Sequence, residues 1–251
     1  MCTVVLLRRP GHRWPLLLAA NRDERIDRPW DPPARHWPDR EDVTAGRDQE
    51  AGGTWLGIND HGVVAAILNR SGSLGPADGK RSRGELVLDA LDFADAREAA
   101  EAIGDLDAGA YRSFNLVIAD NEDAFWIKGL GRGAPIVAPA PSGVSVLTAH
   151  DLNDTAASPR ARHYLPLFED GPIPNPETND WVGWEALLAS KDMAPGEFEP
   201  NAAIHVETDY GFGTVSSSLI ALPNRNEETL KPHWRFARVW PEREAFTGIM
   251  P

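Results

Sequence analysis

The sequence predicts a mixed α+β fold, and three observations support this prediction. Short apolar runs of the kind that form β-strands occur from the start of the chain to near its end. Most come in pairs separated by turn residues, as in β-hairpins, rather than alternating regularly with helices. Helical patterns stand out in only three stretches. No repeat, low-complexity stretch or shift in charge marks a boundary, so we expect residues 1–251 to form a single domain.

The first predicted element is a hairpin at the start of the chain. Two strand-like runs, Cys2–Arg8 and Trp14–Asn21, flank the turn residues Pro10-Gly11-His12. Antiparallel pairing across such a turn sets Cys2 opposite roughly Asn21. The polar cluster Asn21-Arg22-Asp23-Glu24 then emerges beside Cys2.

Three further elements follow before the middle of the chain. Residues 25–53 are rich in Pro and Trp, which disfavours a regular helix or central strand, and we expect an ordered flap at the rim of a site. Residues 54–58 and 63–69 predict a second hairpin around a turn at 59–62. Ser82 and Glu85 form a capping-box pattern that predicts a helix to about Ile103.

The glycine-rich stretch at 72–83 allows two interpretations. Its basic residues Lys80, Arg81 and Arg83 could hold an anionic group near the helix start, but the glycine spacing does not match a phosphate-binding loop. We favour a solvated loop. The remaining pattern predicts strands at 114–118, 124–127 and 143–148, helices at 158–168 and 181–190, and strands at 203–207, 214–222 and 234–240.

Composition excludes several classes of function. A net charge of −13 argues against nucleic acid or an anionic membrane surface as a partner, since both attract clustered Lys and Arg. Apolar runs are too short to span a bilayer, and the start of the chain lacks the apolar core of a signal peptide. One cysteine and seven scattered histidines offer no metal cluster, so we expect no metal and no other cofactor. The lone cysteine suits a reducing cytosol, which predicts a cytoplasmic protein.

Cys2 is the strongest candidate for chemistry. A small residue after an initiator Met normally allows the Met to be removed, which would leave a free α-amine beside the thiol. That amine has an ordinary pKa of about 7.7–8.0, so a nucleophile and a general base would share one residue. Asp23 could hold or orient the amine, and Arg22 could pair with Glu24 or with a substrate carboxylate. The alternative is a chance cysteine in an apolar strand, but the second position in a chain with no other cysteine favours a functional role.

These residues carry a family resemblance. Met1-Cys2-Thr3 followed by Ala20-Asn21-Arg22-Asp23-Glu24 resembles the signature of the NRDE family, whose eukaryotic members are transport and Golgi organisation protein 2 homologues. More distantly, the layout is similar to choloylglycine hydrolase and penicillin V acylase, which are N-terminal-nucleophile (Ntn) hydrolases. The resemblance is dense over residues 1–72 and thin after about residue 155. It implies a four-layer αββα sandwich and cleavage of a linear amide or related acyl bond in a small-molecule substrate.

The resemblance also implies roles for individual residues. Cys2 is the nucleophile, Asp23 orients its amine, and Asn69 donates a hydrogen bond to the oxyanion. Asn69 could instead only cap its strand. Asn21, Arg22, Glu24 and His150 are expected around the substrate. His150 stands where the acylases have an asparagine pair, and it is either a replacement donor or a plain surface histidine.

A second function fits the same residues. Eukaryotic relatives are associated with Golgi organisation, lipid metabolism and haem handling, which suggests a non-catalytic protein that binds or carries a hydrophobic ligand such as a lipid or haem. Cys2 would then be a ligand or simply structural, and the Trp-rich flap would cover the bound molecule. Retention of Met1 would leave no free amine on Cys2 and would favour this alternative.

Overall fold

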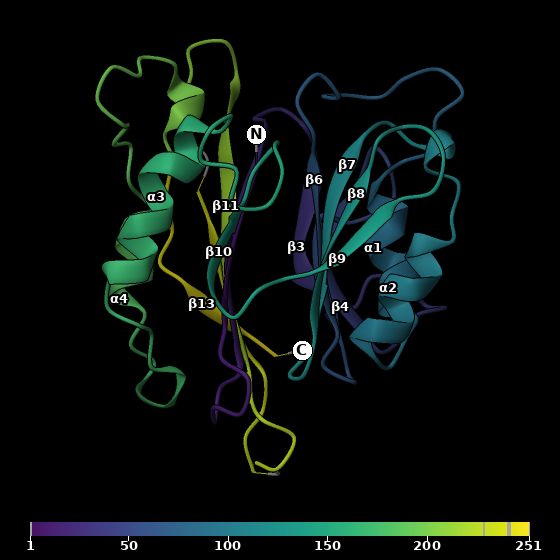
Figure 1. Cartoon of the computed structure of the whole chain (residues 1–251), viewed down its shortest axis with the longest axis vertical. Coiled ribbons are helices and arrows are strands. Elements are labelled where there is room, and N and C mark those ends of the chain that lie inside the picture. The colour runs from purple at the N-terminus through teal and green to yellow at the C-terminus, as the bar shows by residue number, and fades with distance from the viewer. Residues whose placement is uncertain (1, 228, 240–241, 251) are drawn as a thin grey trace.

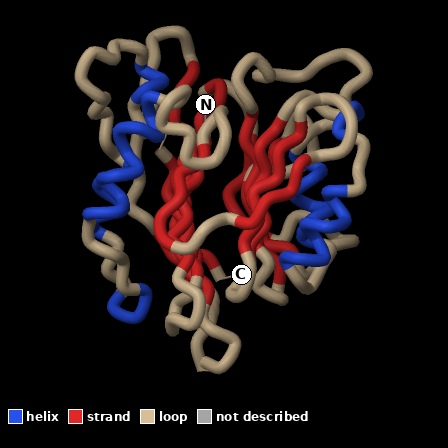
Figure 2. The backbone as a smooth tube through the Cα atoms, in the orientation of Figure 1, coloured by secondary structure: helices blue, strands red, loops and turns tan. Residues whose placement is uncertain are grey.

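The computed structural model describes residues 2–227, 229–239 and 242–250, and it arranges them in four layers. Two antiparallel sheets face each other in the middle, and helices cover the outer face of each sheet (Figures 1 and 2). The predicted α+β class and the αββα order of layers are both confirmed. Met1 and Trp240, the expected end of the last strand, lie outside the described residues.

The first sheet has six strands and contains the start of the chain. All its neighbouring strands pair antiparallel. Their order across the sheet is β10 (Gly143–Leu147), β1 (Thr3–Arg8), β2 (Leu16–Arg25), β11 (Phe212–Leu222), β12 (His233–Arg238) and β13 (Thr247–Ile249).

The second sheet has seven strands, which follow the order of the chain. Each strand pairs antiparallel with the next. They are β3 (Trp30–Ala34), β4 (Val43–Asp48), β5 (Leu56–Asn59), β6 (Val64–Asn69), β7 (Phe114–Ala119), β8 (Ala124–Gly129) and β9 (Ile136–Pro139).

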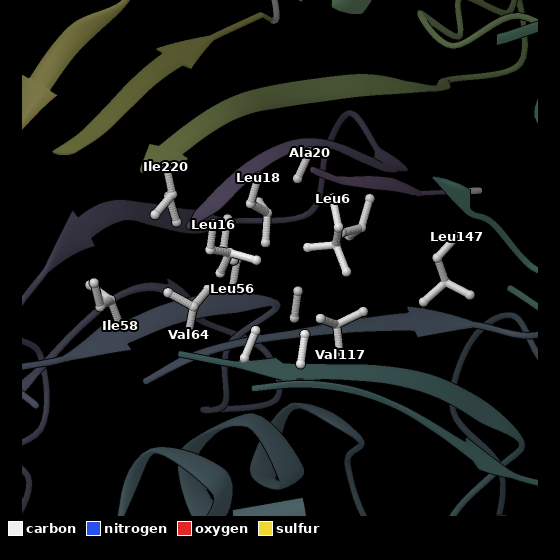
Figure 3. Packing of buried hydrophobic residues seen from close by; sticks show 14 of the residues in the cluster. Leu6, Leu16, Leu18, Ala20, Leu56, Ile58, Val64, Val117, Leu147 and Ile220 are labelled. Carbon is white, nitrogen blue, oxygen red and sulfur yellow. The ribbon is translucent and has the colours of Figure 1, made fainter. Parts of the chain in front are cut away.

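The core between the sheets follows from the two-residue period of a strand. Leu16, Leu18 and Ala20 on β2 point toward the second sheet, where they pack with residues such as Leu56 and Val117 (Figure 3). The alternate residues of β2 point the other way, into a second core beneath the helices. Because β2 is buried on both faces, it is apolar without a break from Leu16 to Ala20.

Each helix pair covers one sheet. Helices α1 (Gly84–Leu91) and α2 (Ala96–Gly104) pack on the second sheet, and α3 (Pro159–Asp170) and α4 (Val182–Leu188) pack on the first. Short 3-10 turns lie at Ala108–Ala110, Pro176–Thr178 and Pro200–Ala202. Within the described ranges, every helix is too short or too polar to cross a membrane.

The structure corrects several predicted elements. Residues 25–53 are not only a flap, because they contain β3 and β4. The helix predicted at 82–103 is broken into α1 and α2. Residues 203–207 form no strand; this segment follows a 3-10 turn and contributes one isolated bridge, Glu207 with Gly213. Two short edge strands, β9 and β13, were not predicted.

The first hairpin forms as predicted, with its register displaced by one residue. Thr3, rather than Cys2, pairs with Asn21. Cys2 therefore lies next to Arg22 and Asp23, at the point where the hairpin opens.

Candidate functional site

A cleft of about 690 Å³ lies beside Cys2. It is bordered by the end of β2, the end of β6 and the loop that precedes α1. Cys2, Asp23 and Asn69 all line it, together with Arg22 and Glu24. Five of the seven residues that the sequence singled out therefore meet at one cavity, although they come from both sheets.

The Cys2 sulfur is held by the backbone of Asp23. The thiol donates to the Asp23 carbonyl oxygen at 3.6 Å, and the Asp23 N–H donates to the sulfur at 3.4 Å. Burial raises the pKa of the Cys2 thiol, and the negative charge of Asp23 raises it further, while the Asp23 backbone hydrogen bond and Arg22 oppose this rise. The thiol therefore keeps its proton at neutral pH, and its activation requires a base.

The Asp23 carboxylate is tied to the helical layer. Thr214 Oγ1 donates to Asp23 Oδ1 at 2.7 Å, and Arg160 Nη1 donates to Oδ2 at 3.2 Å. Arg160, from the first turn of α3, also donates to Thr3 Oγ1 at 2.7 Å. Both partners of the ion pair are almost fully buried, with 4% of the Arg160 side chain and 0% of the Asp23 side chain exposed. These contacts fix the end of β2 relative to β1, β11 and α3.

Asn69 is the last residue of β6, in the second sheet, and it lines the cleft that Cys2 and Asp23 also border. It is half-buried, and its side-chain amide makes no hydrogen bond to the rest of the described chain. The amide is therefore available to a bound molecule. A strand-capping role would require local backbone partners, which the side chain does not have.

Arg22 and Glu24 belong to a charged network at the cleft floor. The Arg22 guanidinium stacks over Trp55, 4.1 Å from the ring centroid, and Nη2 lies 3.2 Å from Asp48 Oδ2. Glu24 lies 4.0 Å from Arg22 and 3.8 Å from Arg28. Burial lowers the pKa of Arg22, an effect that its acidic neighbours partly offset.

Asn21 and His150 do not line the cleft. The Asn21 amide donates to the carbonyls of Leu188 and Ile204, both at 2.9 Å, and its oxygen accepts from Ser217 at 2.6 Å. Asn21 therefore faces the helical layer and binds that layer to the sheet. At His150 the backbone carbonyl accepts from Asn115 Nδ2 at 2.6 Å, which holds the loop after β10 against β7.

Comparison with known proteins identifies the family. Residues 1–170 match the family model described as Transport and Golgi organisation 2. The chain belongs to this family. Among curated Transport and Golgi organisation 2 homologues, it is 36% identical to the mouse protein over 115 residues, 40% to the bovine protein over 114 and 39% to the human protein over 111. Each match covers 42% of this chain but only 38% of the relative.

Solved Ntn hydrolases share the fold of this Transport and Golgi organisation 2 family member. A Caenorhabditis elegans N-acylethanolamine-hydrolyzing acid amidase ortholog superposes with a TM-score of 0.59 at 13% identity, covering 87% of this chain and 92% of the other. Penicillin V acylase from Agrobacterium tumefaciens gives 0.58 at 14% identity, covering 96% and 84%. A mutant of conjugated bile acid hydrolase from Clostridium perfringens gives 0.56 at 13%, covering 99% and 92%. At such identities the likeness concerns the fold alone.

Sequence reasoning missed several residues that shape the cleft of this family member. Arg160 and Thr214 hold Asp23, and Asp48 holds Arg22; no spacing in the sequence relates these distant positions. The loop at 72–83 is mostly exposed, as predicted, and it also forms a cleft wall. Arg83 donates to the carbonyls of Ser73 at 2.8 Å and Ser113 at 3.1 Å, and burial lowers its pKa to about 10, with a smaller contribution from Arg112.

Among the described residues, no group of three or more His, Cys, Asp or Glu side chains is arranged so that it could hold a metal ion.

Proposed function

We propose that the protein is an N-terminal-nucleophile hydrolase that cleaves a linear amide or related acyl bond, with Cys2 as the nucleophile. One observation carries this proposal: the Cys2 sulfur, the Asp23 backbone and the unengaged Asn69 amide border a single cleft. The fold shared with amidases and acylases supports the same reaction class.

Activation begins with removal of the residue before Cys2. The α-amine that this exposes has an ordinary pKa of about 7.7–8.0, which lets it accept the thiol proton near neutral pH. A base is needed because burial raises the pKa of the thiol. Asp23 then stabilises the resulting ammonium and keeps it beside the sulfur.

The reaction proceeds through an acyl-enzyme. The thiolate attacks the acyl carbon, a C–S bond forms, and the carbonyl electron pair moves to oxygen. The Asn69 amide donates a hydrogen bond to this oxyanion, as an oxyanion-hole donor does. The C–N bond of the tetrahedral species then breaks, and the departing amine takes the proton from the α-ammonium of Cys2. The α-amine of Cys2 next deprotonates a water molecule. The water oxygen attacks the thioester, the C–S bond breaks, and the acid and the free thiol are released.

Intact mass and an acyl probe test the proposal together. We expect the purified protein to lack Met1, and we expect turnover of one class among acyl-amides, thioesters and lactones. Cys2→Ala should abolish turnover, and Cys2→Ser should reduce it strongly because a hydroxyl is a poorer nucleophile. Ser71→Ala, an exposed change close to Asn69, should have no effect.

A protein that retains Met1, or turnover that persists in Cys2→Ala, would rule out the nucleophile. If the protein shows no turnover, the second candidate function is non-catalytic binding of a hydrophobic ligand, such as a lipid or haem, in the same cleft. Burial of the Cys2 thiol, which raises its pKa, favours this candidate because a protonated thiol is a poor nucleophile. Ligand binding unchanged in Cys2→Ala, with no turnover in the parent, would support it.

A further inference from the structure

One nitrogen of the Arg22 guanidinium lacks an acceptor. Only 5% of the Arg22 side chain is exposed, and Nη2 is engaged with Asp48. Nη1 is buried and has no hydrogen-bond partner among the residues the structure describes. Since a buried cationic N–H without an acceptor is unfavourable, this position indicates a missing anionic or polar oxygen.

The charge around Arg22 supports an anionic occupant. Although the chain carries a net charge of −13, basic side chains outnumber acidic ones around the cleft. The basic ones are Arg22, Arg25, Arg28, Lys80, Arg81, Arg83 and Arg112, and the acidic ones are Asp23, Glu24, Asp48 and Glu50. A cavity with an excess of one sign of charge concentrates ligands of the opposite sign.

The other basic side chains have partners within the protein. Arg28 binds Asp48 through two nitrogens, at 2.6 and 3.0 Å. Arg112 donates to carbonyls of the loop before α1, including that of Gly72 at 2.9 Å. Arg81 pairs with Glu85 at 2.7 Å. Among these cleft cations, Arg22 Nη1 is therefore the nitrogen that is both buried and left without an acceptor by the described residues, and it can donate one charge-assisted hydrogen bond to a carboxylate oxygen.

Apolar side chains border the same space. Trp55 stacks on Arg22, and Ile67 and Leu74 line the cleft beside it. A volume of about 690 Å³ is typical of sites that enclose a small organic molecule. The ligand should thus combine an anionic end with an apolar body.

We propose that the cleft binds an organic carboxylate with an apolar body, one of whose oxygens accepts a hydrogen bond from Arg22 Nη1 beside Cys2. This inference rests on the proposed function in one respect: the statement that the bound carboxylate represents the class of substrate. Binding itself requires no hydrolysis, so it is measured in a variant that lacks the nucleophile.

Calorimetry on the 251-residue chain with Cys2→Ala compares decanoate with its neutral counterpart, decanamide. We expect decanoate to bind more tightly. Arg22→Gln should weaken decanoate binding about tenfold to a hundredfold, as expected for loss of a charge-assisted hydrogen bond, and leave decanamide unaffected. Arg22→Lys retains the charge toward Asp48 but loses the second nitrogen, and it should show the same selective loss. Arg97→Gln is the control, since it removes one positive charge from an exposed position outside the cleft, and should bind decanoate as the parent does.

Three outcomes would overturn the inference. They are equal binding of decanoate and decanamide, equal weakening of decanoate binding by Arg97→Gln and Arg22→Gln, and decanoate binding that Arg22→Gln leaves unchanged. The last is the expected result if a water molecule takes the Arg22 N–H in the small cavity of about 20 Å³ that Cys2 and Arg22 also border. Selective decanoate binding in a protein without hydrolytic turnover would keep this inference and discard only the hydrolase.

Discussion

The alternation of side chains along β2 decides which residues of the Asn21–Glu24 cluster can reach a ligand. Successive residues of a strand point to opposite faces. Asn21 and the Asp23 carboxylate point to the helical layer, where they bind α4 and α3. Arg22 points toward the second sheet and stacks on Trp55. The motif therefore combines two functions. The side chains of Asn21 and Asp23 anchor the strand to the helical layer, and that of Arg22 borders the cleft.

Asn69 and Asn21 should respond in opposite ways to substitution. Asn69→Ala removes a side chain without internal hydrogen bonds, so we expect little change in stability. If Asn69 is the oxyanion donor, kcat should fall about a hundredfold to a thousandfold. Steady-state kinetics on the acyl substrate and a thermal melt measure the two effects separately.

Asn21→Ala is the matched comparison. It leaves two buried carbonyls and the Ser217 hydroxyl without their partner, and should lower the free energy of unfolding by about 2–4 kcal/mol. Unchanged kcat in Asn69→Ala would exclude the oxyanion role, and unchanged stability in Asn21→Ala would contradict the anchoring role.

Sequence reasoning identified the residues near Cys2 because a hairpin brings its two strand ends together. The meeting of Asn69 with Cys2 came from family resemblance, since they lie in different sheets. Arg160 and Thr214 could not be predicted, because their contact with Asp23 depends on how α3 and β11 pack. A one-residue error in register also placed Asn21 beside the substrate. Counting alternate residues from Leu16 onward puts Asn21 on the opposite face of β2 from Arg22, which borders the cleft.

At the scale of elements, the break between α1 and α2 follows from a capping residue. Asp95 is the N-cap of α2, and its carboxylate accepts from the backbone N–H groups of Arg97 at 2.8 Å and Glu98 at 3.2 Å. The pair Asp95 and Glu98 has the spacing of a capping box, so the sequence did contain the signal for a second helix start. The predicted cap at Ser82 is weaker, since Ser82 Oγ accepts only from Gly84 at 3.3 Å and the N-cap is Arg83.

Replacing the two candidate caps distinguishes them. Asp95→Ala should lower the free energy of unfolding by about 1 kcal/mol, because two N–H groups at the start of α2 lose their acceptor. Ser82→Ala should cost less than half as much. Urea titration of both variants beside the parent measures the difference. An equal loss of unfolding free energy in the two variants would contradict the conclusion that Asp95 is the stronger cap.

The proline-rich segment shows what composition alone cannot predict. Pro32 and Pro33 lie in β3, which is an edge strand whose pairing with β4 is irregular between Asp31 and Ala34. An edge strand tolerates proline because one row of its N–H groups needs no ladder partner. The exclusion of a central strand holds for the prolines of β3 but is wrong for the segment as a whole, because β4 lies inside the sheet between β3 and β5.

Asp48, at the end of β4, makes the stability of this region dependent on pH. Burial alone would raise the pKa of Asp48, but the hydrogen bonds from Arg28 and Ala51 and the charges of Arg28 and Arg22 outweigh it and hold this pKa below its ordinary value. A lowered folded-state pKa means that the unfolded chain binds the proton more readily. The stabilisation by Asp48 is therefore complete above about pH 4, near the pKa of an unfolded Asp, and is lost as the pH falls through the folded-state value.

Asp48→Asn tests this dependence. We expect it to cost about 2–3 kcal/mol of unfolding free energy at neutral pH, since Arg28 and Arg22 lose a partly buried partner. The difference from the parent should narrow below about pH 4, where the unfolded chain begins to bind the proton, and should disappear as the pH falls through the lower folded-state pKa of Asp48. Urea unfolding over a pH series measures it. Asp27→Asn, at a position 76% exposed, should show no such trend, and a gap independent of pH would contradict the assignment to Asp48.

Across the whole molecule, the order of layers was predictable only through the family, because distant pairings build the first sheet. β2 lies between β1, its neighbour in sequence, and β11, which comes near the end of the chain. Local patterns predict strands but not such partners. The same pairing places Thr214 of β11 opposite Asp23 of β2, so the strand that carries Asp23 is stabilised from the far end of the chain.

The Arg160–Asp23 ion pair should couple the outer helical layer to the end of β2. Both side chains are almost completely buried, so removing one charge leaves the other desolvated. We expect Asp23→Asn and Arg160→Gln each to cost about 3–5 kcal/mol of unfolding free energy, and the double variant to cost clearly less than the sum of the two. Arg162→Gln is the control on the same helix; its pair with Glu197 is partly exposed and should be worth less than about 1 kcal/mol. A double-mutant cycle from urea titrations gives the coupling, and additive single effects would mean that α3 and β2 are stabilised independently.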